Sequence, residues 1–398
     1  MRPDLPSEWQ RKPLLEVATL PRGQVDPRRE PFRSQILIAP DHIESGTGRV
    51  LSYETAEAQG AISGKYPIAP GDVLLSKIRP ALRKVVHAEV VGLCSADVYP
   101  LRAGPEIDSR YLFAVLLSPE FTAFAESLSG RSGIPKINRS ELAEYCIKLP
   151  PLAEQRRIAE ILEAVDESIR CTERLIAKHR SSQEGLLHRA LNDGIRDATW
   201  LSLGQLASST KLGTTIRGNG RGETVPLLKM GNLRWGSIEI SRYERVSRKL
   251  VGSSFSEFRL ADRDLLFNTR NTPDLVGKTA VWREELADAI ADNNILRIRL
   301  TPPANPHWVC CYMSRSTGRR KIASLATGTT SVAAIYWRDL RTLPIPIPPL
   351  DYQVRLEEIW LESDSQIACE QRSLLKLYQL KQAVVDDLLT GRVRGPGR

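Results

Sequence analysis

The stretch "PPLAEQRRIAEILEAVDESI", residues 150–169, places two prolines directly before an amphipathic helical pattern. A second stretch, "PPLDYQVRLEEIWLESDSQI" at 348–367, repeats this junction 198 residues later. Proline ends the preceding strand and is favoured in the first turn of a helix, where its missing N–H costs no hydrogen bond. The repeat predicts one structural unit written twice, each copy ending in a long helix.

The repeat extends beyond the two junctions. "GDVLLSK" at 71–77 resembles "RDLLFNT" at 263–269, and "APDHIESGTG" at 39–48 loosely resembles "KMGNLRWGSI" at 229–238. The predicted organisation is a first globular domain at 1–150, a first long helix at 151–195, a second globular domain at 196–347, and a second long helix with a C-terminal tail at 348–398.

Both globular segments have a mixed, β-rich pattern. Short apolar runs bounded by Gly, Pro, Asn or Asp predict strands, and these runs are "QILIAP" (35–40), "DVLLSKI" (72–78), "DVYPLRA" (97–103), "TVPLLKM" (224–230), "TAVWRE" (279–284) and "NILRIRL" (294–300). Residues 109–128 have the apolar spacing of a helix. The predicted fold class is therefore α+β, with two pseudo-symmetric β-rich globular domains separated by the two long helices.

Each long helix carries one apolar seam with alternating spacings of four and three residues. A helix of about 40 residues is roughly 60 Å long at 1.5 Å per residue, which exceeds the size of a small domain. The sequence predicts that the two helices pair as an antiparallel coiled coil with the domains at opposite ends. The alternative is that each helix packs on its own globular domain.

The net charge of +9 is unevenly distributed along the chain. Residues 196–347 contain 23 Lys and Arg against 13 Asp and Glu, whereas the other three segments are nearly neutral. A basic segment of this kind favours a polyanion, such as nucleic acid, as its partner. Solubility alone is the other explanation of the charge.

Recognisable enzyme motifs are lacking. No Walker-type loop and no G-x-S-x-G turn occurs, and "NPHW" at 305–308 departs from the Asn-Pro-Pro-aromatic motif of amino-methyltransferases at His307. The six cysteines have no C-x-x-C spacing and the five histidines form no helical pair, so neither a zinc site nor a disulfide framework is expected. No apolar run has the length of a membrane span. The sequence indicates a non-catalytic binding protein of the cytoplasm.

Polar loops recur at matching positions in the two halves. "SGRSGIPKINR" (129–139) and "TGTTSVAAIYW" (327–337) precede the two helices, while "LLSKIRP" (74–80) and "LFNTRNTPD" (266–274) end strands. Freed backbone N–H groups, hydroxyls and basic side chains bind phosphates, and Arg and Asn can read base edges. The candidate DNA-binding residues are Lys77, Arg79, Arg131, Ser132, Lys136, Asn138, Arg139, Lys229, Asn232, Asn268, Arg270, Asn271, Thr329 and Thr330.

Together these motifs resemble the specificity subunit of Type I DNA restriction-modification enzymes. The resemblance rests on "LPPLAEQRRIAEIL" (149–162) and "IPPLDYQVRLEEIW" (347–360), each after a Gly-Thr/Ser loop, and on "GDVLLS" (71–76) and "LKQAVVDDLLTGRVR" (380–394). It covers essentially the whole chain. The second copy departs from the first where Tyr352 replaces Glu154 and where its pre-helix loop lacks basic residues.

The resemblance implies two target recognition domains, each reading one half of a split double-stranded DNA sequence. It also implies a coiled-coil spacer that docks two methyltransferase subunits, with restriction (motor) subunits completing the complex. S-adenosylmethionine would belong to the methyltransferase subunits, and ATP and Mg to the restriction subunits, so no cofactor is expected in this chain. The candidate coiled-coil or partner-binding residues are Gln155, Ile158, Leu162, Val165, Ile169, Gln353, Leu356, Trp360, Ile367 and Leu374.

Two other functions are compatible with the sequence. One is a single-chain nuclease or methyltransferase whose active site is disguised. The other is a structural adaptor that docks protein partners through its helices without reading DNA.

Overall fold

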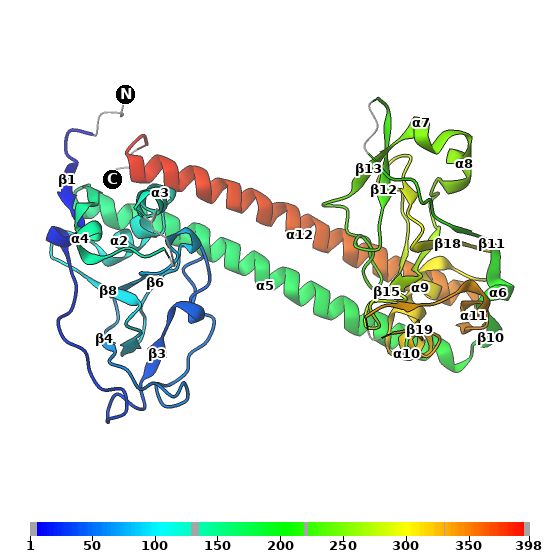
Figure 1. Ribbon diagram of the computed structural model, residues 1–398, viewed down its shortest axis with the longest axis horizontal. Coiled ribbons are helices and arrows are strands. Elements are labelled where there is room, and N and C mark those ends of the chain that lie inside the picture. The colour runs from blue at the N-terminus through cyan, green and yellow to red at the C-terminus, as the bar shows by residue number, and fades with distance from the viewer. Residues whose placement is uncertain (1–5, 129–134, 219–221, 330, 394–398) are drawn as a thin grey trace. The chain divides into compact units, whose positions relative to one another are not determined.

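The computed structural model of the chain describes residues 6–128, 135–218, 222–329 and 331–393. The chain divides into two compact units, the first formed by residues 1–174 and 372–398 and the second by residues 175–371. The two longest helices, α5 (Leu152–Arg196) and α12 (Leu350–Thr390), each contribute one part to each unit (Figure 1). They occupy the segments in which the sequence predicts the spacer helices.

The first unit is built on a four-stranded antiparallel sheet and a three-stranded mixed sheet. The strand orders are β2 (Ala18–Thr19), β8 (Val98–Ala103), β5 (Val73–Ser76), β6 (Val85–His87), and β3 (Ile36–Ile38), β7 (Gly92–Cys94), β4 (Tyr66–Ile68). The first and last strands of the domain, β1 (Gln10–Pro13) and β9 (Cys146–Leu149), pair with each other. Its short helices are α1 (Leu14–Val17), α2 (Ser109–Leu116), α3 (Pro119–Ser127) and α4 (Arg139–Glu144).

The core of the first unit joins the four-stranded sheet to the long helices. Val73 and Leu101 of the sheet and Leu112 of α2 are buried in one cluster with Ile158 of α5 and Leu388 of α12. Removal of this apolar surface from water is the main force that attaches the helix ends to the domain.

The second unit repeats this plan. Its strand orders are β11 (Ala207–Leu212), β18 (Ile295–Leu300), β14 (Leu265–Asn268), β16 (Thr279–Val281); then β13 (Glu244–Ser247), β12 (Thr224–Leu228), β17 (Ile290–Ala291); and β15 (Arg270–Asn271), β20 (Ala333–Ala334), β19 (Thr327–Gly328). β10 (Thr199–Ser202) pairs with β21 (Pro344–Ile347), as β1 pairs with β9. Its short helices are α6 (Leu203–Leu206), α7 (Arg248–Val251), α8 (Phe255–Phe258), α9 (Pro306–Ser314), α10 (Ser316–Ala323) and α11 (Trp337–Leu340).

A buried carboxylate shows how closely the two units correspond. Asp72 precedes β5 and pairs with Arg102 at 2.9 Å, and Asp264 precedes β14 and pairs with Arg299 at 2.8 Å. Both carboxylates are almost fully buried, and each also accepts a backbone N–H from the residue three positions before it. The internal repeat predicted from "GDVLLSK" and "RDLLFNT" is thus a repeat of structure.

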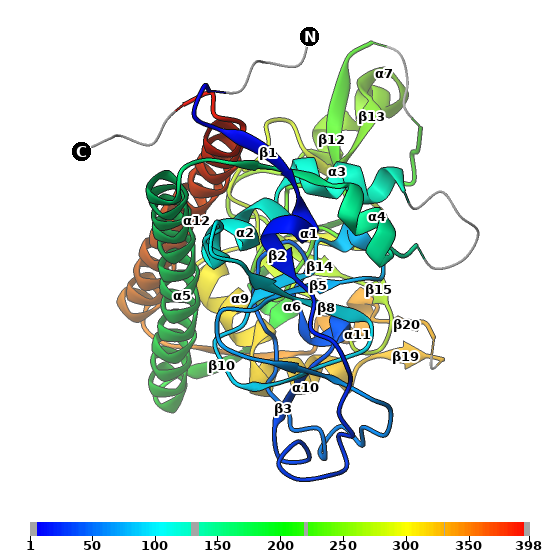
Figure 2. The ribbon, with the colours of Figure 1, turned by 90° about the vertical axis from the view of Figure 1, so that its left-hand side faces the viewer.

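In the first unit, α5 and α12 lie side by side and run in opposite directions (Figures 1 and 2). Asp166 of α5 forms an ion pair with Lys381 of α12 at 2.5 Å. One to two turns further along α5, Glu173 accepts a hydrogen bond from the Tyr378 hydroxyl at 2.7 Å. The partner number falls as the α5 number rises, which defines an antiparallel pair.

The second unit contains the same antiparallel arrangement. Gln183 of α5 donates to the carboxylate of Asp364 on α12 at 2.8 Å. Further along α5, Gly194 packs so closely on Tyr352 that a Cβ there would lie 2.9 Å from the ring. Within each unit the two helices therefore pack on each other and also on the core of that unit.

The sequence stretch 109–128 is two helices rather than one. α2 ends at Leu116, and Ser118 caps α3 by accepting a hydrogen bond from the Phe121 N–H at 3.2 Å, while Pro119 takes the first position of α3. A proline at this place removes a backbone donor from a continuous helix but fits a new first turn.

Candidate nucleic-acid interface

Two polar loops that the sequence analysis selected separately meet at one edge of the first unit. The segment after β5 is bonded to the pre-helix loop: Arg79 N–H donates to the Pro135 carbonyl at 2.8 Å, and Ile137 N–H donates to the Lys77 carbonyl at 3.0 Å. Ile78 and Lys136 are paired as an isolated antiparallel bridge. We call the segments 77–79 and 135–139 the first polar edge.

The second unit forms an equivalent edge. Arg270 and Asn271 of β15 pair with β20, and the Ile335 N–H donates to the Thr269 carbonyl at 2.9 Å. This last bond matches the one between Ile137 and Lys77 in the first unit. We call the segments 269–271 and 327–338 the second polar edge, apart from residue 330, which is outside the described residues.

Several predicted contact residues are exposed on these edges. In the first unit they are Arg79, Lys136 and Arg139, and in the second Arg270 and Thr329. Lys136 is only loosely paired, with 3.8 Å between its ammonium and the Asp97 carboxylate. Exposed cations on an edge of this kind can approach phosphates without first breaking a strong ion pair.

Lys77 and Lys229 are half-buried and already hold partners within the protein. The ammonium of Lys77 lies 4.3 Å from the centre of the Tyr99 ring and contacts the Ala96 carbonyl. Burial lowers the pKa of Lys77, against the opposing effect of nearby Asp97. Lys229 is ion-paired with Glu244. Both lysines therefore stabilise the conformation of their loops in addition to contributing positive charge.

Four predicted asparagines serve the fold. Asn138 caps α4 through a capping box with Glu141. The buried Asn232 side chain bonds three backbone groups of its own loop, and the fully buried Asn268 amide donates to the carbonyls of Arg270 and Asn294. Asn271 in turn donates to the Asn268 side chain at 2.9 Å. These amides hold the loops in place, and the buried pair, Asn232 and Asn268, cannot reach a base edge in this structure.

Three further candidates, Arg131, Ser132 and Thr330, lie outside the described residues. The sequence analysis also missed two residues on the second polar edge. Tyr336 is 49% exposed, and the guanidinium of Arg338 lies 5.5 Å from its ring centre. An exposed aromatic ring beside an arginine is a common platform for a base or a sugar. The signal was the run "IYWR" (335–338), whose first three residues end the selected loop.

The helix junctions are locked by one glutamine in each unit. Gln155 is fully buried; its Oε1 accepts the Asp108 N–H at 2.8 Å, and its Nε2 donates to the carbonyls of Glu106 and Pro150 at 3.0 and 2.8 Å. A single side chain thereby ties the start of α5 to the segment before α2. It satisfies three backbone groups, of which the Pro150 carbonyl is buried and the other two are partly buried.

Gln353 repeats this arrangement in the second unit. Its Oε1 accepts the Asn305 N–H at 2.8 Å, and its Nε2 donates to the carbonyls of Pro303 and Pro348 at 2.9 and 2.8 Å. The two glutamines were candidates for a coiled-coil or partner contact, but their side chains are enclosed within their own units. The junction motif is therefore conserved between the halves for a structural reason.

The remaining seam candidates divide by burial. Buried side chains are Ile158, Leu162, Ile169, Leu356, Trp360 and Ile367, whereas Val165 and Leu374 are half-buried. The first group packs against other helices or the domain cores, as a coiled-coil seam requires.

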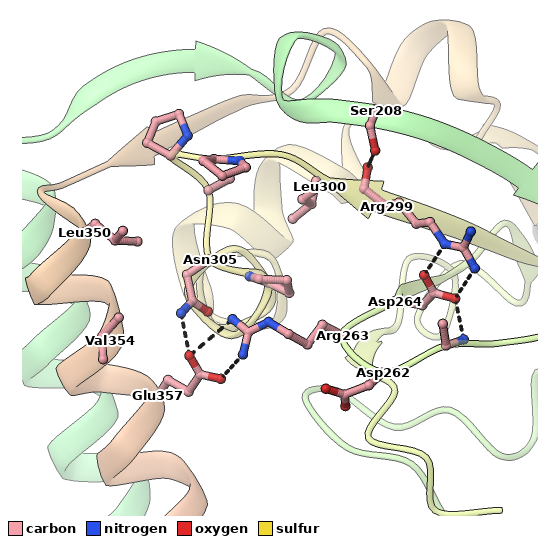
Figure 3. Close-up of a pocket in the computed structure, with 15 residues that line it drawn as sticks. Ser208, Asp262, Arg263, Asp264, Arg299, Leu300, Asn305, Leu350, Val354 and Glu357 are labelled. Carbon is pink, nitrogen blue, oxygen red and sulfur yellow. Dashed lines mark hydrogen bonds and ion pairs between the residues drawn. The ribbon is translucent and has the colours of Figure 1, made fainter. Parts of the chain in front are cut away.

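A cavity of about 600 Å³ borders the second junction (Figure 3). Arg263 and Asn305 both point at the carboxylate of Glu357 on α12, and Arg299 and Asp264 form a second pair on the far wall. Burial opposes ionisation of Glu357, but hydrogen bonds from Arg263 and Asn305 outweigh it and lower its pKa. Because the charged groups of the cavity are paired with one another, we interpret the cavity as the attachment site of α12 and not as a reaction centre.

Within the described residues, no group of His, Cys, Asp and Glu is arranged to hold a metal ion. A search of the same residues finds no helix with both the length and the apolar character needed to cross a membrane.

Comparisons with known proteins agree with this architecture. The Type I restriction modification DNA specificity domain matches residues 6–178. The Type I restriction enzyme EcoDI specificity subunit of Escherichia coli is 33% identical over 202 residues, which are 50% of this chain but only 44% of that protein. The EcoKI specificity subunit of Escherichia coli strain K12 is 22% identical over 433 residues, and the match covers 99% of this chain and 91% of that protein.

A solved structure concerned with complex assembly and conformational transition of the type I R-M system has the same fold. Its TM-score is 0.61 at 23% identity, and the match covers 98% of this chain and 100% of that one. The matched domain, the relatives that span one or both halves, and the two-unit architecture agree. Residues 6–178 match the type I restriction modification DNA specificity domain, and the chain is similar to type I restriction enzyme specificity subunits over one half or over nearly its full length.

Proposed function

We propose that this chain is the DNA sequence-recognition subunit of a type I restriction-modification complex. It reads a bipartite double-stranded target, with one half-site for each recognition domain. The observation that carries the proposal is the pair of equivalent polar edges, one on each unit, in which a strand-end loop is bonded to the pre-helix loop. Each edge rests on its own sheet and core, so each can present a different set of side chains to DNA.

On these edges, affinity and sequence reading come from different residues. Arg79, Lys136 and Arg139 would neutralise phosphates at the first half-site, because exposed cations release counterions from DNA. Arg270, with Tyr336 and Arg338, would supply direct contacts at the second. The first edge is the more basic and the second the more aromatic, so the two half-sites are read by different chemistry.

The helix pairs are the proposed docking site for two methyltransferase subunits, to which restriction (motor) subunits are added. Catalysis and cofactors belong to those partners: S-adenosylmethionine to the methyltransferase, and ATP and Mg to the restriction subunit. This chain contributes recognition and assembly. A subunit acting on the DNA of its own cell works in the cytoplasm.

The decisive test is the methylation pattern of genomic DNA in cells with and without this chain. We expect a split recognition sequence to be methylated only when the chain is present together with its methyltransferase. An unchanged pattern would contradict the proposal. Binding of S-adenosylmethionine, or Mg²⁺-dependent cutting of DNA, by the purified chain alone would instead establish an enzyme.

A single-residue prediction concerns the second polar edge. Arg270→Ala should weaken DNA binding of the assembled methyltransferase by about 1–3 kcal/mol and relax the base preference only within one half-site. Competition among duplexes with single base substitutions measures both effects. Arg259→Ala is the matched control, because Arg259 is an exposed arginine of the same unit that is paired with Asp288. Equal effects of the two substitutions would remove Arg270 from the interface.

A further inference from the structure

A second cavity, of about 550 Å³, lies within the first unit. Its walls come from the loop 46–49, from the turn before β5 at Gly71, and from α2, α5 and α12. Ala159 and Leu162 of α5 line it, as does Tyr378 of α12. None of the DNA-binding candidates lines this cavity, which lies against the helix pair rather than on a polar edge. We call it the α5 socket.

In the second unit, the position equivalent to the α5 socket is occupied by a side chain of the protein. α9 corresponds to α2: Trp308 of α9 donates to the Pro346 carbonyl at 2.6 Å, and Tyr111 of α2 donates to the Lys148 carbonyl at 2.7 Å. Both carbonyls lie in the strand just before a Pro-Pro junction. Facing α9 is Trp360, which stands 198 residues after Leu162.

The indole of Trp360 fills the space that is open in the first unit. Its side chain is 6% exposed, and its ring meets the His307 ring edge-on at 6.1 Å. The guanidinium of Arg315 lies 5.1 Å from the ring centre, and a Cβ on Gly236 would lie 3.2 Å from the ring. The loop that carries Gly236 corresponds to the loop 46–49 of the first unit, since each follows the first strand of its three-stranded sheet.

Three substitutions between the copies account for the cavity. Where the second unit has Trp360, the first has Leu162, and where the second has Glu357, the first has Ala159. Arg263, which reaches Glu357, corresponds to Gly71 directly before the buried aspartate. Each replacement in the first unit is smaller, so an indole and an Arg–Glu pair are missing from the same place.

Several charged groups around the socket already have ion-pair partners within the protein. Arg110 pairs with Glu163 at 2.6 Å, Lys381 pairs with Asp166, and Arg49 pairs with Glu173 at 2.8 Å. The floor is apolar, formed by side chains such as Phe113, Leu117, Leu162 and Ile169. A rim of largely paired charges around an apolar floor suits a flat apolar group.

The helix beside the socket extends this apolar surface. Tyr378 lies on its rim at 42% exposure, and Leu375, one turn earlier on the same helix, is 60% exposed. Exposed apolar side chains next to a hollow are typical of a protein docking site in which one anchor residue enters a pocket. A free small molecule would use the hollow alone and would leave this surface without a role.

We propose that the α5 socket receives an aromatic side chain of the methyltransferase subunit, in the place that Trp360 occupies in the second unit. This inference rests on the proposed function, which supplies the partner. It adds that the two copies hold their partners differently. The first unit offers an open socket, whereas the second has closed the equivalent one with its own tryptophan.

The test is a series of full-length variants that close the socket, assayed for binding to the methyltransferase subunit of the same system. Leu162→Trp copies the second unit and should weaken binding by about thirtyfold, the loss expected when one hot-spot contact is removed. The same variant should raise the midpoint of thermal unfolding, because it fills a cavity. Ala159→Leu fills the socket from the preceding turn of α5. It is the second test variant if the indole of Leu162→Trp does not fit, and it should also weaken binding.

Ile62→Trp is the matched control, since it adds the same indole at an exposed position of the first unit that does not line the socket, and it should leave binding unchanged. Trp360→Leu opens the second position and should lower the unfolding midpoint. Equal methyltransferase affinity of the wild type, Leu162→Trp and Ala159→Leu overturns the socket proposal alone. Failure of the wild-type chain to bind any methyltransferase subunit overturns the proposed function as well.

Indole is the probe that separates a side chain from a small-molecule ligand. It should bind the wild-type chain, fail to bind Leu162→Trp, and be displaced when the methyltransferase subunit is added; ligand-observed NMR measures all three. Indole that remains bound in the assembled complex would make the cavity a small-molecule site and overturn the docking of a side chain.

Discussion

Exchange of residues 196–347 for the equivalent domain of another specificity subunit is expected to replace one half of the methylated DNA sequence and to leave the other half unaltered. The exchanged segment begins and ends in a single small sheet, because β10 pairs along its length with β21. The recognition loops between these strands rest on a core separate from that of the first unit. No described hydrogen bond of the second polar edge needs a residue outside the exchanged segment.

Sequencing of methylated positions in cells that carry the hybrid chain measures this result. The incoming domain must keep the backbone partners of Gln353, namely the N–H at 305 and the carbonyl at 303, or α12 will lose its attachment. The reciprocal exchange of residues 1–150 should alter the other half-site alone. A hybrid in which both halves change would refute modular reading.

Replacement of the junction glutamines is expected to have the largest effect on stability. Gln155→Leu keeps a similar side-chain size but removes the partner of the buried Pro150 carbonyl and of the partly buried Asp108 N–H and Glu106 carbonyl. Each lost partner of a buried group costs about 1–3 kcal/mol, so the first unit should lose about 3 kcal/mol or more. Gln353→Leu should have the same effect on the second unit.

Hydrogen exchange provides a readout for each unit separately. The backbone amide of residue 108 should exchange faster in Gln155→Leu, and that of residue 305 in Gln353→Leu, with the other unit unaffected. Gln371→Leu is the control, because Gln371 is exposed on α12. If the exchange rates of the Gln155→Leu and Gln371→Leu variants are equal, the glutamine is not what locks the junction.

Much of the architecture was readable because its signals are local or periodic. The Pro-Pro junctions, the seams of the long helices and the short apolar runs each depend on neighbouring residues, and the structure has helices or strands at each of them. The break between two helices within 109–128 also had a local signal, the N-cap Ser118 followed by Pro119. The continuous apolar spacing of this stretch nevertheless predicted a single helix.

Site residues were harder to read, because an asparagine in a loop is equally suited to contact DNA or to hold the backbone. Asn138 carried a local signal of its structural role, a glutamate three residues later that completes a capping box. Asn232 and Asn268 carried none, since their partners are backbone carbonyls, which leave no mark in the sequence. Gln155 and Gln353 also bond backbone groups. The repeat identified both glutamines, but their partners could not be inferred from the sequence.

The sequence by itself determined that the chain is one unit written twice, with a β-rich domain and a long helix in each copy. Only the tertiary structure decided that the segments around Lys77 and Ile137 form one edge, as do those around Thr269 and Ile335. It also decided that Leu162 faces a cavity where Trp360 faces a filled core. Secondary structure follows from short-range periodicity, whereas these features arise from backbone bonds and side-chain volumes brought together across distant parts of the chain.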